Sequence, residues 1–228
     1  MRAYARGAPI RIIGASFTGV GDLYWYVRAD SPIKTLADAN ESNTIAFSSN
    51  GSSVHNVVLA FAHELGTKAK PVQTGGLPAT LTQVMSGQVD IGWATPPFGL
   101  KEADEGKIRI IASGDDVPSL GNQTVRVEIA NLAVCQNQDL LTRFMRAYRE
   151  SLAFIADPRA IKTYADSIGA TEKLVSAAIE KFHLQRGKQL DRVSDVEALM
   201  AEGVKLKFLD KPLTKEQLTE LITILPPS

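Results

Sequence analysis

The sequence predicts an α/β protein built around a mainly parallel sheet. Short apolar runs alternate with helical patterns between residues 43 and 120, which is the spacing of strand–helix–strand units. From residue 139 onward the pattern is helical only. Two longer β-type runs, 22–28 and 125–135, bracket the alternating block. A block that is entered and left through neighbouring strands is typical of a domain inserted into another domain.

The composition favours an ordinary globular protein. The chain has 228 residues, of which 44% are hydrophobic and 22% charged, enough for one large or two small domains. Lys plus Arg and Asp plus Glu number 25 each, so no basic surplus supports nucleic-acid binding. No apolar run approaches the ~18 residues of a membrane span, and the first residues lack the apolar core of a signal peptide. Cys135 lies in an apolar run and is expected to be a buried small side chain.

The first elements of the chain are β-type. A short strand is expected at 10–14, followed by a loop as far as 21 and by the aromatic-rich strand 22–28. The run 44–48 predicts a further strand that ends in a turn at 49–53. A helix follows and stops at Gly66, because apolar residues recur with a helical period at Val54, Val57, Val58, Phe61, Ala62 and Leu65.

The next segment repeats this strand–turn–helix order. A strand at 71–73 leads into the turn 74–76, and Pro78 stands where the first turn of a helix tolerates proline. Further strands are expected at 89–93 and 108–112. The loops at the carboxyl ends of parallel strands gather on one side of a sheet, so both glycine turns should lie there.

The last part of the chain is interpreted as a helical scaffold. Helices are expected behind the cap Asp139, from Pro158, and around 174–182. Two more should begin with capping boxes, formed by Ser194 with Glu197 and by Thr214 with Gln217.

The turn at 49–53 is the first candidate binding feature. Ser52 or Ser53 can cap the following helix, and Gly51 lets the chain turn sharply. Free backbone amides at the positive end of a helix make a site for a small anion or a carboxylate-like group. Taken alone, the same residues are more typical of an ordinary capped helix after a strand.

The chain resembles the ABC-transporter substrate-binding proteins of the nitrate, sulfonate and taurine type. The likeness spans residues 5–185 and is carried by five segments in the family's order: ARGAPIRIIG, DLYWYVRADSPIKTLADA, IAFSSNGSSVHNVVLAFAHELG, GGLPATLTQVMSGQVDIGWATPPF and GKIRIIASGDD. The resemblance implies the two-lobed type II periplasmic-binding-protein fold. Lobe one would comprise 1–42 and 122–228 with its C-terminal helices, and lobe two the inserted α/β domain 43–121, with the ligand in the interlobe cleft.

The resemblance also implies a difference at the N-terminus. Members of this family usually begin with a signal peptide and a β-α-β-α segment, whereas this sequence starts close to ARGAP. Lobe one is therefore expected to be N-terminally truncated and to leave an apolar sheet edge or face exposed.

Ligand contacts are implied for the residues that match the family's turns. They are Ser49, Asn50, Gly51, Ser52, Ser53, His55, Thr74, Gly75, Gly76, Thr95, Pro96 and Trp25. A surface position is the alternative for His55, and core packing is the alternative for Trp25. His63 and His183 are expected at the surface, Asp90 is expected to hold a turn, and the Asp115–Asp116 pair is expected to be a solvated loop.

The resulting functional hypothesis is the solute-binding component of an ABC importer. The ligand would be a small organic anion of the sulfonate, nitrate or taurine class, although a carboxylate or a neutral heterocycle stays open. The partner would be an ABC permease of the inner membrane. The resemblance implies a periplasmic location, and the complete protein is expected to be a monomer. We expect no enzyme activity, cofactor or metal, because the sequence contains no nucleophile elbow, zinc motif or Walker lysine. The alternatives are a thiamin-pyrimidine-synthase-like enzyme and the effector domain of a regulator.

Overall fold

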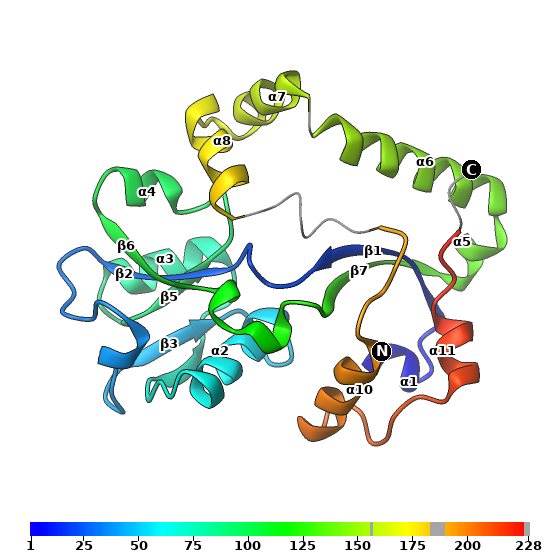
Figure 1. Ribbon diagram of the computed structural model, residues 1–228, viewed down its shortest axis with the longest axis horizontal. Helices are drawn as coiled ribbons and strands as arrows, with labels where there is room; N and C mark the ends of the chain where they lie inside the picture. Colours follow the sequence, from blue (N-terminus) through cyan, green and yellow to red (C-terminus); the bar gives the residue numbers. More distant parts are fainter. Residues whose placement is uncertain (156, 183–189, 226–228) are drawn as a thin grey trace. The chain divides into compact units, whose positions relative to one another are not determined.

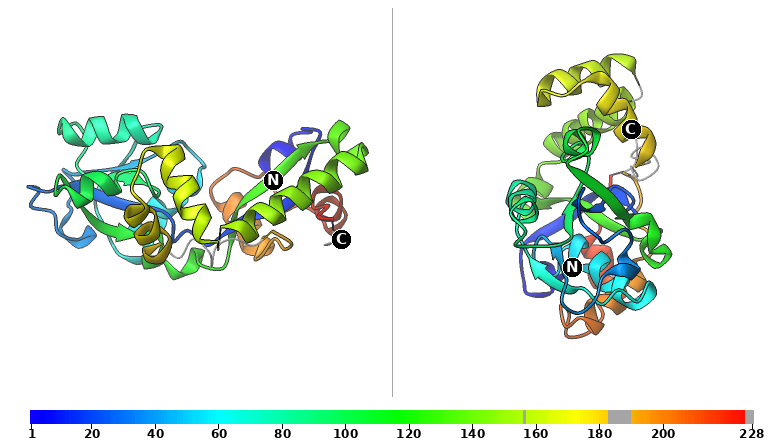
Figure 2. Two further views of the ribbon diagram at one scale, coloured as in Figure 1. Left: turned by 90° about the horizontal axis from the view of Figure 1, so that it is seen from above. Right: turned by 90° about the vertical axis from the view of Figure 1, so that its left-hand side faces the viewer.

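The chain folds as two compact units. The computed structural model describes residues 1–155, 157–182 and 190–225. Unit 1 consists of Met1–Thr18, Asn122–Thr163 and Arg186–Ser228, and unit 2 of Gly19–Gly121 and Tyr164–Gln185. Figures 1 and 2 show the ribbon of both units.

Unit 2 contains a mixed sheet in the order β4-β3-β5-β2-β6 (Figure 1). β4 pairs in parallel with β3, and β3 joins β5 through a parallel bridge between Ile45 and Ile91. β2 runs antiparallel to both β5 and β6. The α/β class expected from the sequence is confirmed, but the expectation of a mainly parallel sheet is wrong, because β2 pairs antiparallel with both of its neighbours. Its strands are β2 Tyr24–Arg28, β3 Thr44–Phe47, β4 Lys70–Gln73, β5 Gly92–Ala94 and β6 Ile108–Ser113.

The central strand β2 is buried on both faces. Tyr24, Trp25 and Tyr26 are each 0% exposed, although neighbouring side chains of a strand point to opposite faces. Trp25 packs edge-on against Phe61 of one helix, with 4.7 Å between ring centroids. Tyr24 stacks on Phe182 at 5.1 Å. The helices of this unit are α2 Ser53–Glu64, α3 Leu77–Met85, α4 Leu100–Asp104 and α8 Glu172–Lys181, with the short 3-10 turns Leu36–Asp38, Gly114–Asp116 and Pro118–Leu120.

Unit 1 is built on the antiparallel pair β1 Ile10–Thr18 and β7 Thr124–Asn131. Ile12 packs into one apolar cluster with Met200, Leu209, Leu213 and Leu221. Its neighbour Ile13 packs into another with Leu141, Met145 and Leu190. The two clusters therefore lie on opposite faces of β1. The helices of the unit are α1 Arg2–Ala5, α5 Leu132–Gln136, α6 Gln138–Phe154, α10 Val196–Lys205 and α11 Lys215–Leu221, and the unit boundary falls inside α7 Pro158–Ile168.

Large apolar side chains remain in solvent on unit 1. Ile129 of β7 is 58% exposed, and Phe144 of α6 is 46% exposed. Leu132 and Leu140 are also exposed. Only Ile129 of these four residues lies on the sheet, and the others lie on α5 and α6, so the exposed apolar sheet edge or face expected from the sequence is limited to one side chain.

The division into units differs from the expected ranges. Residues 19–42 belong to the same unit as 43–121, because β2 lies between β5 and β6. Residues 164–185 also belong to unit 2, where Phe182 stacks on Tyr24.

Several local expectations were wrong. The strand expected at 10–14 continues as β1 to Thr18, where a loop was expected. The run 125–135 is not one strand, since Asn131 ends β7 and its side chain accepts a hydrogen bond from the Val134 amide, which starts α5 with a half-buried Cys135. Asn137, not Asp139, caps α6. Ser194 does not cap α10, because its backbone is bonded to Thr124 of β7.

Two other expectations about local structure are confirmed. The capping box of Thr214 with Gln217 is present at α11. Asp90 holds a turn as expected, because its Oδ2 accepts hydrogen bonds from the Thr44 amide at 2.8 Å and the Thr44 hydroxyl at 2.9 Å. His183 lies outside the described residues.

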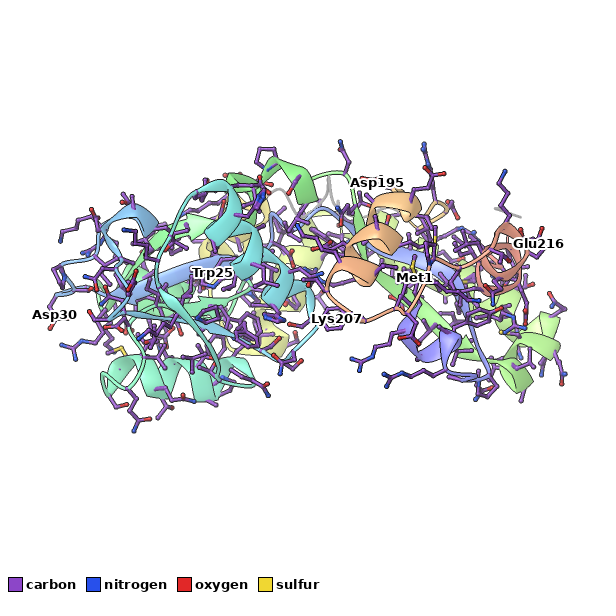
Figure 3. All side chains as sticks on the ribbon, turned by 90° about the horizontal axis from the view of Figure 1, so that it is seen from below. Met1, Trp25, Asp30, Asp195, Lys207 and Glu216 are labelled. Carbon is purple, nitrogen blue, oxygen red and sulfur yellow. The ribbon has the colours of Figure 1, made fainter. Side chains whose placement is uncertain are left out.

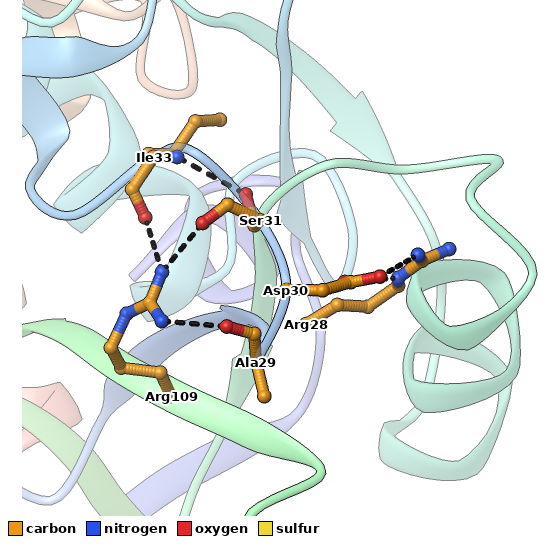
Figure 4. Close-up of polar contacts among 6 residues, drawn as sticks. All are labelled: Arg28, Ala29, Asp30, Ser31, Ile33 and Arg109. Carbon is orange, nitrogen blue, oxygen red and sulfur yellow. Dashed lines mark hydrogen bonds and ion pairs between the residues drawn. The ribbon is translucent and has the colours of Figure 1, made fainter.

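Arg109 of β6 fixes the loop that follows β2 (Figure 4). Its guanidinium donates to the carbonyl oxygens of Ala29 at 2.8 Å, Ser31 at 2.8 Å and Ile33 at 3.0 Å. In the same view, Arg28 pairs with Asp30 at the exposed surface, with 2.9 Å between Nε and Oδ1. Of these two arginines, only Arg109 donates hydrogen bonds to partly buried backbone carbonyl groups.

We predict that Arg109→Met lowers the free energy of unfolding of unit 2 by about 3 kcal/mol, because three carbonyl groups lose a charged donor. Arg28→Met is the matched control and should cost less than about 1 kcal/mol, as expected for an exposed ion pair. Denaturant unfolding followed by tryptophan fluorescence measures both, since the 2 tryptophans, Trp25 and Trp93, lie in unit 2. Equal losses in the two variants would contradict the role given to Arg109.

Candidate functional site

The turns after β3 and β4 lie side by side at one edge of the unit 2 sheet. The Gly75 amide donates to the Ser48 carbonyl at 3.2 Å, and the Thr74 amide donates to the Phe47 carbonyl at 2.9 Å. Gly75 has φ +80°, which a side chain would strain. The structure thus brings together the two glycine turns singled out from the sequence.

The first turn delivers the start of α2. Ser52 is its N-cap, and its Oγ accepts a hydrogen bond from the His55 amide at 3.1 Å. Ser48 Oγ lies 2.9 Å from the same Ser52 Oγ. Among the described residues, the amides of Ser53 and Val54 have no hydrogen-bond partner. Ser49 and Asn50 form the exposed tip of this turn.

His55 is held in its neutral form by the same turn. Its Nδ1 accepts the Gly51 amide at 3.1 Å, so the ring proton is on Nε2. The ring stacks on Phe47, with 4.3 Å between ring centroids. Partial burial lowers the pKa of His55, and the helix start opposes protonation as well. Gly51 supplies the left-handed backbone at φ +80° that lets its amide face the ring.

The second turn delivers the start of α3. Gly76 is the N-cap, and the amides of Leu77 and Ala79 have no partner among the described residues. Thr74 is only 7% exposed, and its hydroxyl lies 2.6 Å from that of the fully buried Thr80. The Thr74 side chain therefore braces the turn from inside, and the backbone amides are the groups this turn offers to a ligand.

Thr95 and Pro96 follow β5 at the same edge, since β5 and β3 run in parallel. Thr95 donates its hydroxyl proton to Asp22 Oδ2 at 3.2 Å. Asp22 is 5% exposed and stands just before β2, which runs antiparallel to β5 and so begins where β5 ends. A buried carboxylate thus stands at the edge that carries the free amides.

Trp25 lies in the core of unit 2 and has no exposed surface. Its Nε1 donates to the Ala46 carbonyl at 3.1 Å. Figure 3 labels it among the packed side chains of the unit, whereas Asp30 lies at the periphery. A direct ligand contact would require this side chain to leave its place against Phe61.

Two functional candidates were missed in the sequence. Asp22 precedes an aromatic strand, and nothing in the local pattern shows that its carboxylate is buried. Ser48 was assigned to the end of a strand, yet its carbonyl accepts the Gly75 amide that joins the two turns. Both depend on which strands become neighbours, and that information is not local.

The described residues contain no cluster of three or more His, Cys, Asp or Glu that could hold a metal ion. In the described part of the chain, no helix is both long and apolar enough to cross a membrane. Asp116 accepts the Ser113 amide at 2.7 Å, so this carboxylate helps to close the turn after β6.

A family model described as NMT1/THI5 like matches residues 1–161. The comparison with curated protein sequences gave no match.

Solved structures show the fold. The alkanesulfonate-binding protein SsuA of Xanthomonas axonopodis pv. citri, bound to MOPS, is 20% identical, with a TM-score of 0.76 over 98% of this chain and 76% of that chain. The periplasmic aliphatic sulphonate-binding protein SsuA of Escherichia coli is 20% identical, with a TM-score of 0.72 over 96% and 75%. A Candida albicans protein with the generic periplasmic-binding-protein fold is 12% identical, with a TM-score of 0.67 over 98% and 76%. The fold expected from the sequence is confirmed.

We predict that His55 makes the stability of unit 2 depend on pH. A lowered folded-state pKa gives stability that is fully present above the unfolded-state pKa of about 6.5 and is lost as the pH falls through the folded value. Between pH about 7.5 and 5, the wild type should lose more thermal stability than His55→Asn, whose amide oxygen can still accept the Gly51 amide.

His63→Asn is the control for this experiment, because His63 is exposed on the same helix. It should follow the wild type at every pH. Parallel pH profiles for the wild type and His55→Asn would contradict the assigned protonation state.

Proposed function

Because the chain belongs to the NMT1/THI5-like family, we propose that it is the solute-binding component of an ABC importer and binds a small organic monoanion of the sulfonate class. The likeness to alkanesulfonate-binding proteins at the level of fold supports this class. We also propose that the protein binds this anion without converting it chemically.

The observation that carries the proposal is the pair of helix starts at one sheet edge. The amides of Ser53 and Val54 begin α2, those of Leu77 and Ala79 begin α3, and the Gly75–Ser48 bond ties the two turns together. A sulfonate presents three acceptor oxygens with one shared charge, and helix starts supply several donors with partial positive charge. The turn residues Ser49, Asn50, Gly51, Ser52 and Gly76, and the strand end at Thr95 and Pro96, would border the ligand.

Charge near the edge favours a monoanion over a phosphate ester. His55 would offer a neutral Nε2–H donor, since its Nδ1 is occupied by the Gly51 amide. Neither the neutral His55 imidazole nor the Asp22 carboxylate at the same edge supplies a cation for a second charge on the ligand. Trp25 would act indirectly, by fixing Ala46 of β3 through its Nε1.

The proposal extends to partner and location. A permease in the inner membrane would receive the ligand, and the protein would act in the periplasm as a monomer. Support comes from the similar fold of the Escherichia coli SsuA protein, which is a periplasmic aliphatic sulphonate-binding protein.

We predict that Ser53→Pro weakens binding of ethanesulfonate about tenfold, a change of ~1.4 kcal/mol. Proline at the first helical position keeps the helix but removes the free amide. The preceding Ser52 is already extended, with φ −75° and ψ 163°, as a residue before proline must be. Isothermal titration calorimetry measures the affinity.

Ser53→Ala is the matched control, since it removes the hydroxyl and keeps the amide. It should bind more tightly than Ser53→Pro. Equal affinities in wild type and Ser53→Pro, at an unchanged melting temperature, would place the ligand elsewhere. Tighter binding of ethylammonium than of ethanesulfonate would contradict the ligand class.

A further inference from the structure

Unit 2 carries a hollow between α4 and the segment that joins α7 to α8. Its volume is about 720 Å³. The hollow lies over the face of the sheet opposite α2, because Tyr24 points toward it and Trp25 points toward Phe61 of α2. The Tyr24 hydroxyl donates to the Phe98 carbonyl, and its ring stacks on Phe182, so both walls are anchored to the buried strand β2. Figure 1 shows α4 and α8 as neighbours.

The interior of the hollow is largely apolar and partly open to solvent. Phe98 and Leu174 line opposite walls, together with Tyr164 and Ile168. Tyr164 is 46% exposed and Ile168 is 40% exposed. Two large apolar side chains in solvent at the mouth of a hollow gain free energy when a partner covers them.

The rim of the hollow is acidic on the α4 side. Glu105 is neutralised locally, since its carboxylate lies 2.7 Å from Lys107 Nζ and 4.0 Å from Lys101 Nζ. Glu102 and Asp104 line the same rim and form no ion pair among the described residues. The chain as a whole has equal numbers of acidic and basic residues, 25 each, so this local charge is not an effect of composition.

We propose that this groove docks a protein segment that presents lysine or arginine beside large apolar side chains. The apolar side chains of such a segment would fill the hollow over Phe98 and Ile168. Its cations would meet Glu102 and Asp104, since the three carboxylates of this rim outnumber the two lysines beside them, Lys101 and Lys107. The open mouth favours a segment of a partner protein over an enclosed small molecule, because a small ligand requires most of its surface to be covered. The proposal is independent of the sulfonate site.

The probe is a labelled amphipathic helical peptide of leucine and lysine, and its counterpart has glutamate in place of lysine. Fluorescence anisotropy with the full chain should show binding of the lysine peptide that weakens as salt is raised. The double variant Glu102→Gln, Asp104→Asn should weaken binding about tenfold. Glu41→Gln, an exposed acidic position outside the groove, should bind as the wild type does.

Hydrogen exchange gives an independent readout. Protection by the lysine peptide should concentrate in 97–105 and 164–174, and Ile168→Asn should reduce it. Ethanesulfonate binding should stay unchanged in the double variant. Equal binding of the glutamate peptide, equal affinity in the double variant, or protection elsewhere in the chain would overturn the proposal.

Discussion

The parallel pairing of β3 with β4 is the constraint on which the candidate site depends. Two parallel strands end at the same edge, so the helices that follow them must begin there together. The pairing is continued by the Gly75–Ser48 hydrogen bond and extended to β5 by the Ile45–Ile91 bridge. Asp90 secures that bridge through Thr44. Without these contacts the amides at the two helix starts would be separate features of two capped helices.

The same sheet explains why the candidate ligand site lies at its edge. β2 is covered on both faces, so its three aromatic residues serve the core and hold neighbouring elements in place. Trp25 holds β3 through its hydrogen bond to the Ala46 carbonyl. Tyr24 holds the wall of the hollow beside α4 through its hydrogen bond to the Phe98 carbonyl. Polar groups free to meet a ligand therefore come from turns and helix starts, which the packed strands position without taking part in binding.

Much of this architecture could be predicted from the sequence. The helical period from Val54, the glycine turns and the box at Thr214 are signals carried by neighbouring residues, and local physics decides them. The end of β7 could not be predicted, because Asn131 stops an apolar run only by capping a short helix. The burial of Asp22 and the side of the sheet that Trp25 faces depend on strand pairing. The hollow beside α4 could not be predicted from the sequence either, since its walls, 97–105 and 164–174, are far apart in the chain.

The central claim is that free amides at the starts of α2 and α3 bind one anion. Titration of the ¹⁵N-labelled protein with ethanesulfonate, followed by amide chemical shifts, tests it most directly. The account predicts that the amide signals of Ser53, Val54, Leu77 and Ala79 shift together along one saturating curve, with the largest downfield changes in the protein. Shifts confined to one of the two turns, or centred on other amides, would contradict it.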